Sequence, residues 1–173
     1  MSIKPFIHVM NECAPSDIRK TVWSTCMSKH WYFGPPSREG SSSPFWKMDL
    51  EDDPATRALW EHARSACEAK VCSGLTVLRQ YANGHTYGLG DQIHQDDTRE
   101  GTYTLLYYPM PVWHDDWEGE TLYRDRTGEV ILTVKPVPNR AVLFDSRIPH
   151  MGRAPSRAYG GLRVTVAFKL MVK

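Results

Sequence analysis

The spacing of apolar residues changes near residue 75 and divides the chain into two parts. Upstream, apolar residues recur every three to four positions in two stretches, which predicts one helix over 16–29 and a second from Pro54 to about 71–74. The second helix has the clearer start, because Asp53 is a capping residue and Pro54 suits the first helical turn. Short strands are expected over 5–10 and 30–33. The Gly-, Pro- and Ser-rich stretch 34–43 is expected to be a loop, with a mobile lid as the alternative.

Downstream of residue 75, short runs rich in β-branched and aromatic residues alternate with turn residues. Strands are predicted over 75–81, 102–108, 121–124, 130–134, 140–144 and 163–172. Helices followed by an unbroken series of strands favour a helix-backed antiparallel sandwich or barrel over a doubly wound sheet. We therefore expect a mainly β (α+β) fold with one domain over 1–173, in which 1–74 supplies helical and strand support and 75–173 the core.

Composition narrows the classes of function. Lys and Arg total 21 and Asp and Glu total 20, a formal net charge of +1 with no basic run, which disfavours nucleic-acid binding. The four cysteines form no Cys-x-x-Cys pair, so a structural zinc site is not expected. We find no signal-peptide pattern and no apolar run of about 18 residues that could cross a bilayer. These features predict a cytoplasmic protein with reduced thiols and no membrane partner.

The strongest chemical signal is a histidine two residues before an aspartate, His94 and Asp96. On a strand or its extended end these side chains face the same side, as two ligands of one metal ion would. His150 follows just past a later predicted strand, and a barrel could bring it to the pair. Each residue alone is well explained as a surface or turn residue, but two histidines and a carboxylate form the facial triad of non-haem Fe(II) oxygenases. A second His-x-Asp, at His114, lies in a proline-flanked loop and is the weaker candidate.

The last predicted strand carries a charge where a core residue is expected. Arg163 and Thr165 share one face, and Val164, Val166 and Phe168 share the other. A guanidinium on the inner face needs an anionic partner, and its planar fork fits a carboxylate. A dicarboxylate cosubstrate, with one end on the metal and the other on Arg163, would meet that need. The alternative is an arginine in solvent on an edge strand.

Several motifs follow one another in order over roughly the last hundred residues. They are Leu78-Arg-Gln-Tyr81 with Gly84, His94-x-Asp96, Leu105-Leu-Tyr-Tyr108, Trp117-x-Gly119-Glu120-Thr121, Asn139-Arg140 leading to Leu143-Phe144, His150, and Arg163-x-Thr165. Their order and spacing resemble the 2-oxoglutarate- and Fe(II)-dependent dioxygenases, closest to the prolyl-4-hydroxylase-like branch. Two departures from that branch concern the substrate side: Asp91 replaces a common aromatic residue, and Ala167-Phe168 stands where Trp is common.

The resemblance implies a double-stranded β-helix, or jelly roll, backed by N-terminal helices, and an enzyme that uses Fe(II), 2-oxoglutarate and O2. It implies iron ligands at His94, Asp96 and His150. It also implies a cosubstrate site made by Arg163 and Tyr108 at the distal carboxylate of 2-oxoglutarate, with Thr165 assisting and Tyr81 nearby. Related halogenases lack the carboxylate ligand, so the presence of Asp96 favours hydroxylation.

The chain has little beyond this core, which favours hydroxylation of an unactivated C–H bond in a small molecule, amino-acid-like or a natural-product intermediate, with release of succinate and CO2. The alternative is hydroxylation of a prolyl or other residue in a peptide or protein. Candidate substrate contacts are Trp113, Trp117, Arg99 and Arg153. A non-catalytic, metal-binding cupin-like module and a nucleic-acid demethylase are competing classes, but the first would not require Arg163 and the near-zero charge disfavours the second. The pattern makes no prediction of an oligomeric state.

Overall fold

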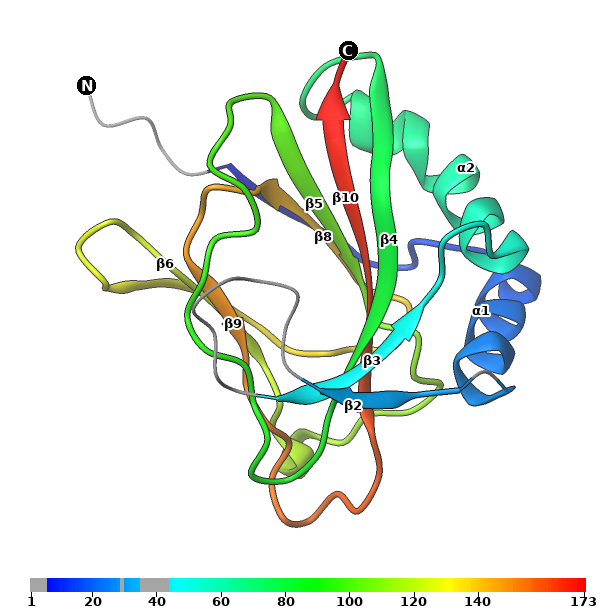
Figure 1. The fold of residues 1–173 in the computed structure, drawn as a ribbon, viewed down its shortest axis with the longest axis vertical. Coiled ribbons are helices and arrows are strands. Elements are labelled where there is room, and N and C mark those ends of the chain that lie inside the picture. Colours follow the sequence, from blue (N-terminus) through cyan, green and yellow to red (C-terminus); the bar gives the residue numbers. More distant parts are fainter. Residues whose placement is uncertain (1–5, 29, 35–43) are drawn as a thin grey trace.

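The structure is a computed structural model that describes residues 6–28, 30–34 and 44–173. Within these ranges the elements follow one another as β1 (Ile7–Met10), α1 (Ser16–Ser28), β2 (Tyr32–Gly34), β3 (Phe45–Asp49), α2 (Pro54–Glu68), β4 (Leu75–His85), β5 (Thr102–Tyr107), the short 3-10 helix η1 (Asp115–Trp117), β6 (Thr121–Arg124), β7 (Val130–Val134), β8 (Ala141–Asp145), β9 (His150–Gly152) and β10 (Arg163–Val172) (Figure 1). The predicted loop over 34–43 lies outside the described residues, except for Gly34.

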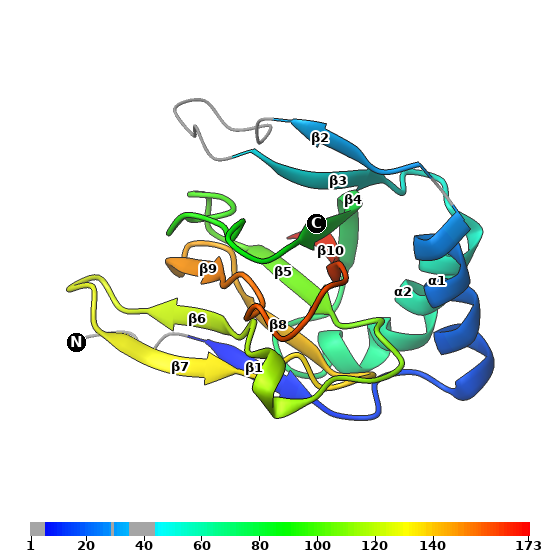
Figure 2. The same ribbon diagram turned by 90° about the horizontal axis from the view of Figure 1, so that it is seen from below.

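The strands form two antiparallel sheets. The larger has the order β1-β8-β5-β10-β4-β3-β2, and the smaller has the order β7-β6-β9. Figure 2 shows the larger sheet curving from β2 and β3 round to β8 and β1, with the smaller sheet at its open side and the helices α1 and α2 on the opposite side. This arrangement confirms the predicted mainly β fold, a double-stranded β-helix backed by N-terminal helices.

The helix α2 starts where the sequence predicts but ends earlier. The Asp53 carboxylate accepts hydrogen bonds from the Ala55 and Thr56 backbone N–H groups, both at 3.0 Å, which satisfies donors that the first helical turn leaves open. At the other end, the Glu68 carboxylate accepts hydrogen bonds from Gly74 N and Leu75 N. Glu68 therefore stabilises the turn into β4, and the chain leaves the helix before the predicted end at 71–74.

Two strands were missed by the sequence pattern, and one is longer than predicted. The mixed sequence of β3 shows no regular alternation, and the strand is held by pairing with β4, from Trp46 opposite Gly84 to Asp49 opposite Tyr81. The β4 strand runs on to His85, past the predicted end at Tyr81, because β3 and β10 flank it. The strand β9 has only three residues. The segment before residue 75 thus contributes strands as well as helices to the larger sheet.

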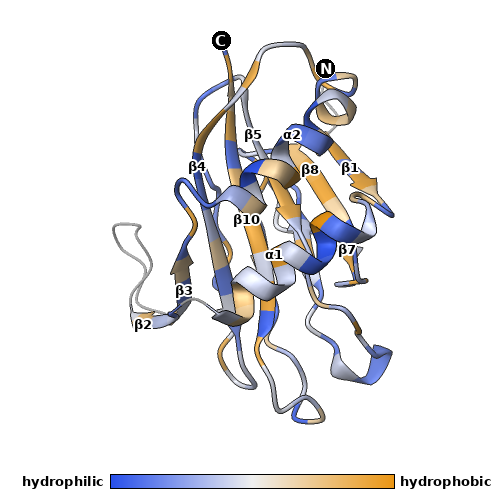
Figure 3. Ribbon diagram, turned by 90° about the vertical axis from the view of Figure 1, so that its right-hand side faces the viewer, coloured by the Kyte–Doolittle hydropathy of each residue, from blue (hydrophilic) through white to orange (hydrophobic). Residues whose placement is uncertain are grey.

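The core lies between the helices and the larger sheet. Figure 3 shows both helices over the apolar strands of that sheet. On β10, the residues Val164, Val166 and Phe168 are fully buried on the helix side, where Trp60 of α2 stacks on Phe168 at 6.2 Å between ring centroids. All four cysteines are free thiols. No helix in the described part of the chain is long and apolar enough to span a membrane.

The cap of α2 gives a first prediction. Replacement Asp53→Ala removes the carboxylate that accepts from two backbone donors, and we expect the free energy of unfolding to fall by about 1 kcal/mol. Urea unfolding followed by circular dichroism measures it. The control Glu61→Ala changes an exposed residue of the same helix and should leave stability within about 0.5 kcal/mol of wild type. Equal stability of the two variants would show that the cap does not stabilise the fold.

Candidate metal and cosubstrate site

Two histidines and one aspartate converge where the two sheets meet. His94 and His150 form an isolated antiparallel bridge, with backbone hydrogen bonds of 2.9 Å and 2.8 Å in the two directions. This bridge brings their imidazoles to 4.3 Å between ring centroids. Asp96 Oδ1 lies 3.3 Å from His94 Nε2, and Asp96 Oδ2 lies 3.4 Å from His150 Nε2. One ligand atom from each of the three residues lies within 4.8 Å of the others, close enough to bind a single ion.

The hydrogen bonds of the two imidazoles leave the Nε2 atoms free for a metal. Nδ1 of His94 lies 2.8 Å from the Gln92 carbonyl oxygen and 3.2 Å from the Asp91 carboxylate. Nδ1 of His150 lies 2.9 Å from the Ile148 carbonyl oxygen. Because these oxygens only accept, each Nδ1 carries the proton and each Nε2 keeps its lone pair. Burial also lowers the pKa of His150, which favours the neutral ring that metal binding requires.

The carboxylate of Asp96 is held by two residues of the sheet. Thr104 Oγ1 donates a hydrogen bond of 2.7 Å to Asp96 Oδ2, and the Lys169 ammonium contacts the same oxygen. Burial by itself raises the pKa of Asp96, but the charge of Lys169 and the neighbouring His150 hold that pKa well below its usual value. The site therefore offers two neutral nitrogen donors and one ionised oxygen donor. That donor set fits Fe(II) in a facial triad.

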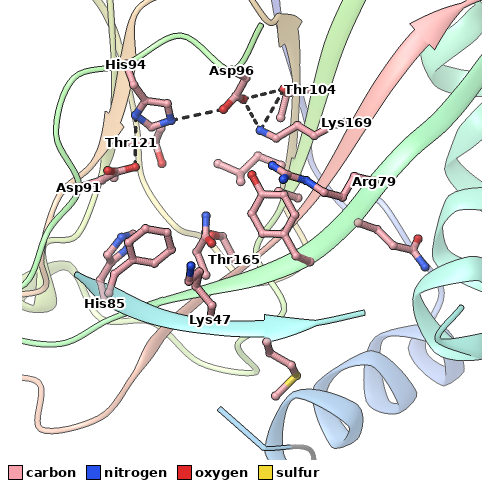
Figure 4. A pocket seen from close by; sticks show the side chains of 18 of the residues that line it. Lys47, Arg79, His85, Asp91, His94, Asp96, Thr104, Thr121, Thr165 and Lys169 are labelled. Carbon is pink, nitrogen blue, oxygen red and sulfur yellow. Dashed lines mark hydrogen bonds and ion pairs between the residues drawn. The ribbon is translucent and has the colours of Figure 1, made fainter. Parts of the chain in front are cut away.

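A cavity of about 250 Å³ extends from the triad between the sheets (Figure 4). Its floor includes one face of β10, from which Arg163, Thr165, Ala167 and Lys169 alternate into it. The alternation confirms that Arg163 and Thr165 share an inner face, opposite the apolar residues that pack under the helices. Tyr81 also lines this cavity, from β4.

Arg163 is a buried cation at the far end of the cavity from Lys169. Its side chain is 1% exposed, and within the described ranges no carboxylate lies within ion-pair distance of it. Its Nε donates to the Gly119 carbonyl oxygen at 2.5 Å, and its Nη2 donates to Thr121 Oγ1 at 3.0 Å. A guanidinium has five N–H donors, so donors remain for an anion in the cavity.

Tyr108 and two glycines complete the surroundings of Arg163. The Tyr108 hydroxyl lies 2.7 Å from Thr121 Oγ1, and its ring lies 5.7 Å from the guanidinium carbon, but Tyr108 itself stands behind the cavity lining. Gly119 has a φ of +77°, and a Cβ there would lie 3.0 Å from Arg163 Cδ. A Cβ at Gly152 would lie 3.0 Å from the His85 ring. The positive φ at Gly119 therefore favours glycine, and a side chain at Gly152 would require the His85 ring to shift.

His85 is a neutral donor beside Arg163. Its Nδ1 lies 3.2 Å from Arg163 Nη1, which donates to it, so the ring proton is on Nε2. Nε2 is buried and has no hydrogen-bond partner among the described residues, although His85 lines the cavity. Burial, followed by the charge of Arg163, lowers the pKa of His85 to about 3. The sequence pattern indicates no role for His85, because no carboxylate stands two residues after it.

The structure brings some of the predicted site residues together and keeps others apart. His94, Asp96, His150, Arg163, Thr165 and Tyr81 all line the cavity. Among the described lining residues, none is one of the four candidate substrate contacts, whose role stays a prediction that this geometry does not support. Trp113 and Trp117 pack edge to face at 5.4 Å, and both rings contact Tyr159. Arg99 is exposed and paired with Asp97, and Arg153 is exposed and paired with Glu118 and Glu120.

Lys169 and Thr104 were also missed, although the alternation on β10 could have revealed the lysine. Lys169 is an even number of residues from Arg163 and Thr165 on the same strand, so its side chain lies on the same face. Thr104 gave no signal, because a threonine in a strand is ordinary.

Comparison with known proteins places the chain in a family. Residues 78–168 match the model of the 2OG-Fe(II) oxygenase superfamily. No curated protein matches the chain in sequence. Similar solved structures include a prolyl-4-hydroxylase from Pseudomonas putida, with 16% identity, 96% of this chain and 92% of that chain covered, and a TM-score of 0.72. HygX from Streptomyces hygroscopicus, with nickel, 2-oxoglutarate and hygromycin B bound, has 12% identity, 96% and 83% coverage, and a TM-score of 0.71.

A prolyl hydroxylase from Trichoplax adhaerens, in complex with a peptide fragment of hypoxia inducible factor, is also similar. It has 18% identity, with 95% of this chain and 83% of that chain covered, and a TM-score of 0.70. At these identities the likenesses establish a shared fold. HygX has the small molecule hygromycin B bound, the Trichoplax protein has a peptide bound, and the Pseudomonas protein is named a prolyl-4-hydroxylase. The substrate class therefore stays open.

Metal affinity should depend on the first His-x-Asp and not on the second. We expect His94→Ala to weaken binding of Fe(II), measured anaerobically by calorimetry, by more than the roughly 10- to 100-fold typical of losing a supporting residue, because it removes a ligand atom. The control His114→Ala alters an exposed histidine outside the cavity and should bind Fe(II) like wild type. Equal affinity of the two variants would contradict the assignment.

The free energy of unfolding should depend on pH in the way expected for a folded protein that keeps His85 neutral. The unfolded imidazole takes up a proton near pH 6.5 and the folded one only near pH 3, so protons bind preferentially to the unfolded chain between these values. The contribution of neutral His85 to the free energy of unfolding is fully present above pH 6.5 and is lost as the pH falls toward 3. Between pH 7 and pH 5, the free energy of unfolding of wild type should fall by roughly 2 kcal/mol more than that of His85→Gln. Urea unfolding at both pH values measures this.

The matched control is His62→Gln, a change at an exposed histidine of α2. It should keep the wild-type dependence on pH. A dependence in His85→Gln equal to that of wild type would show that His85 is not held neutral by the fold.

Proposed function

Because this chain belongs to the 2OG-Fe(II) oxygenase superfamily and is a 2-oxoglutarate-dependent dioxygenase, we propose that it hydroxylates an unactivated C–H bond of a small molecule. The observation that carries the proposal is one cavity with a His-Asp-His triad at one wall and, at the other, an arginine without a carboxylate partner among the described residues. The triad suits a metal, and the arginine suits the far end of a dicarboxylate.

The cofactors fit these residues. His94, Asp96 and His150 would hold Fe(II), and Arg163 would hold the distal carboxylate of 2-oxoglutarate, with Thr165 and Tyr81 beside it. The donors left on Arg163 and the Nε2–H of His85, which has no partner among the described residues, support an anion at this end of the cavity. When bound, Fe(II) and 2-oxoglutarate supply the oxidising chemistry, in which O2 and the cosubstrate are converted with R–H to R–OH, succinate and CO2.

The protein supports this chemistry by position and by exclusion of water. The Gln92 and Ile148 carbonyl oxygens orient the two imidazoles, and Thr104 and Lys169 fix Asp96. Tyr108 acts through Thr121, whose hydroxyl also accepts from Arg163. Leu106 and Ala167 supply apolar lining near the reacting centre. A buried site held in this way keeps the reacting groups aligned and strengthens the charge interactions among them.

Cavity size supports a small substrate. A cavity of about 250 Å³ must hold the cosubstrate and the reacting part of the substrate together. It lies below the range of roughly 300–1,000 Å³ common for ligand pockets, which leaves room for a compact group at the metal. The carboxylate of Asp96 supports hydroxylation as the outcome, because it fills the position that related halogenases leave to chloride.

The cosubstrate site can be tested without a substrate. Fe(II) and then 2-oxoglutarate are added anaerobically to the metal-free protein, and a visible metal-to-ligand charge-transfer band is followed. We expect a band in wild type and at least a tenfold weaker response to 2-oxoglutarate in Arg163→Ala, because the distal carboxylate loses its charge-assisted partner. The control Arg153→Ala changes an exposed arginine and should respond like wild type.

Absence of the band in folded wild-type protein would overturn the proposed cosubstrate site. The substrate class is then tested by succinate release against panels of small metabolites and of proline-containing peptides. Stimulation by small molecules is expected. Stimulation by peptides alone would replace the small-molecule proposal with hydroxylation of a peptide.

A further inference from the structure

Two cations face each other on the wall of the cavity near the triad. Lys169 of β10 and Arg79 of β4 are direct partners in the antiparallel register, and both line the cavity. Both also lie over one aromatic ring, since Lys169 Nζ is 5.6 Å and the Arg79 guanidinium carbon 4.7 Å from the centroid of Tyr81. Figure 4 shows the Lys169 and Arg79 side chains entering the cavity from the same side. Arg79 and Lys169 are called the cationic cluster below.

The two cations of the cluster oppose each other across a strand pair. Like charges placed directly opposite on neighbouring strands destabilise a sheet. The Lys169 side chain is mostly buried and pairs with Asp96, whereas Arg79 is exposed. A bulge at Leu78 shifts the register of these strands next to this pair. Bulges often lie next to active sites, where they turn a side chain toward a ligand. A local arrangement that opposes stability is typical of a functional position.

Among the described residues, one carboxylate lies within ion-pair distance of the cationic cluster. The only acidic partner of Lys169 within ion-pair distance in the described ranges is Asp96, a member of the triad. Arg79 has no carboxylate within that distance among the described residues. Asp49 and Glu51 also line the cavity, but both are exposed, and Asp49 Oδ1 accepts from the Glu51 backbone N–H.

The cluster is separate from the site proposed for the distal carboxylate of 2-oxoglutarate. Arg163 and Lys169 are six residues apart on one extended strand, a separation of roughly 20 Å between their Cα atoms. Arg163 is surrounded by its own partners, Gly119, Thr121 and His85. With a divalent ion and one 2-oxoglutarate in place, the charges of the ion, Asp96, the cosubstrate and Arg163 balance. Lys169 and Arg79 then remain beside the triad, together with Lys47, Asp49, Glu51 and Asp91 of the cavity lining.

We propose that the cationic cluster binds an oxyanion of the substrate, a carboxylate or a phosphate, and so sets which C–H bond lies at the triad. This inference rests on the proposed function and names the substrate as an anion. Arg79 supplies a planar fork and Lys169 a point charge to the same group. Tyr32, Phe45 and Tyr81 line the same cavity and favour an apolar or aromatic body next to the charge.

The experiment uses the Fe(II)·2-oxoglutarate enzyme under anaerobic conditions and matched pairs of probes. Calorimetry compares 3-phenylpropanoate with 3-phenylpropanamide, and phenyl phosphate with phenol. In wild type, at least one anion should bind at least tenfold more tightly than its neutral match, and the preferred pair tells a carboxylate from a phosphate. No preference for either anion, including no binding of any probe, would overturn the proposal.

Variants separate the cluster from the cosubstrate site. Arg79→Met and Lys169→Met should each reduce the preference for the anion at least tenfold, while Lys169→Arg should restore most of it. In Arg79→Met the charge-transfer band and its dependence on 2-oxoglutarate should remain as in wild type, because Arg79 touches neither the triad nor Arg163. Lys135→Met, at an exposed lysine of the other sheet edge paired with Asp115, is the control and should keep the full preference.

The outcomes distinguish the two proposals. A normal charge-transfer band without any anion preference would overturn the cluster proposal alone. Loss of 2-oxoglutarate affinity in Arg79→Met, with anion preference unchanged, would also overturn it, since the cluster would then bind the cosubstrate. Absence of the band in wild type would instead overturn the proposed cosubstrate site.

Discussion

The two-residue alternation of β10 is the constraint on which the rest of the structure depends. Every second side chain, from Val164 to Phe168, packs under the helices, and the residues between them face the cavity. Because the outer face is apolar and fully buried, the strand cannot shift by one position without burying its charges under the helices. Packing of the core therefore fixes Arg163 and Lys169 at opposite ends of the cavity.

The triad depends on a second constraint, the backbone bridge between His94 and His150. This bridge joins the segment before β5 to the smaller sheet, and it brings together ligands that lie far apart in the chain. Carbonyl oxygens at Gln92 and Ile148 then select the ring nitrogen that faces the metal position. The orientation is set by backbone atoms, so it is independent of most side-chain changes around the site.

Among the described residues, some charged residues of the cavity have partners of opposite charge, and others do not. Asp96 is held by Thr104 and Lys169, whereas Arg163 and Arg79 lack carboxylate partners within the described residues. Arg163 is buried, and a buried cation without an anion is costly in a folded protein, whereas Arg79 is exposed at the mouth of the cavity. Positive charge therefore stands at both ends of the cavity, at Arg163 and beside the triad at Lys169 and Arg79.

The sequence by itself determined the features that arise from local periodicity and short spacing. The strand spacing of His94 and Asp96, the inner face shared by Arg163 and Thr165, and the start of α2 at Asp53 follow from residues close together in the chain. The family follows from the order of such local motifs. Only the tertiary structure decided what closure of the two sheets brings together. It placed Lys169 against Asp96 and His85 against Arg163, it made β3 a strand by pairing it with β4, and it packed Trp113 and Trp117 on each other away from the cavity. Contacts across sheets depend on register and closure, which no local pattern of residues specifies.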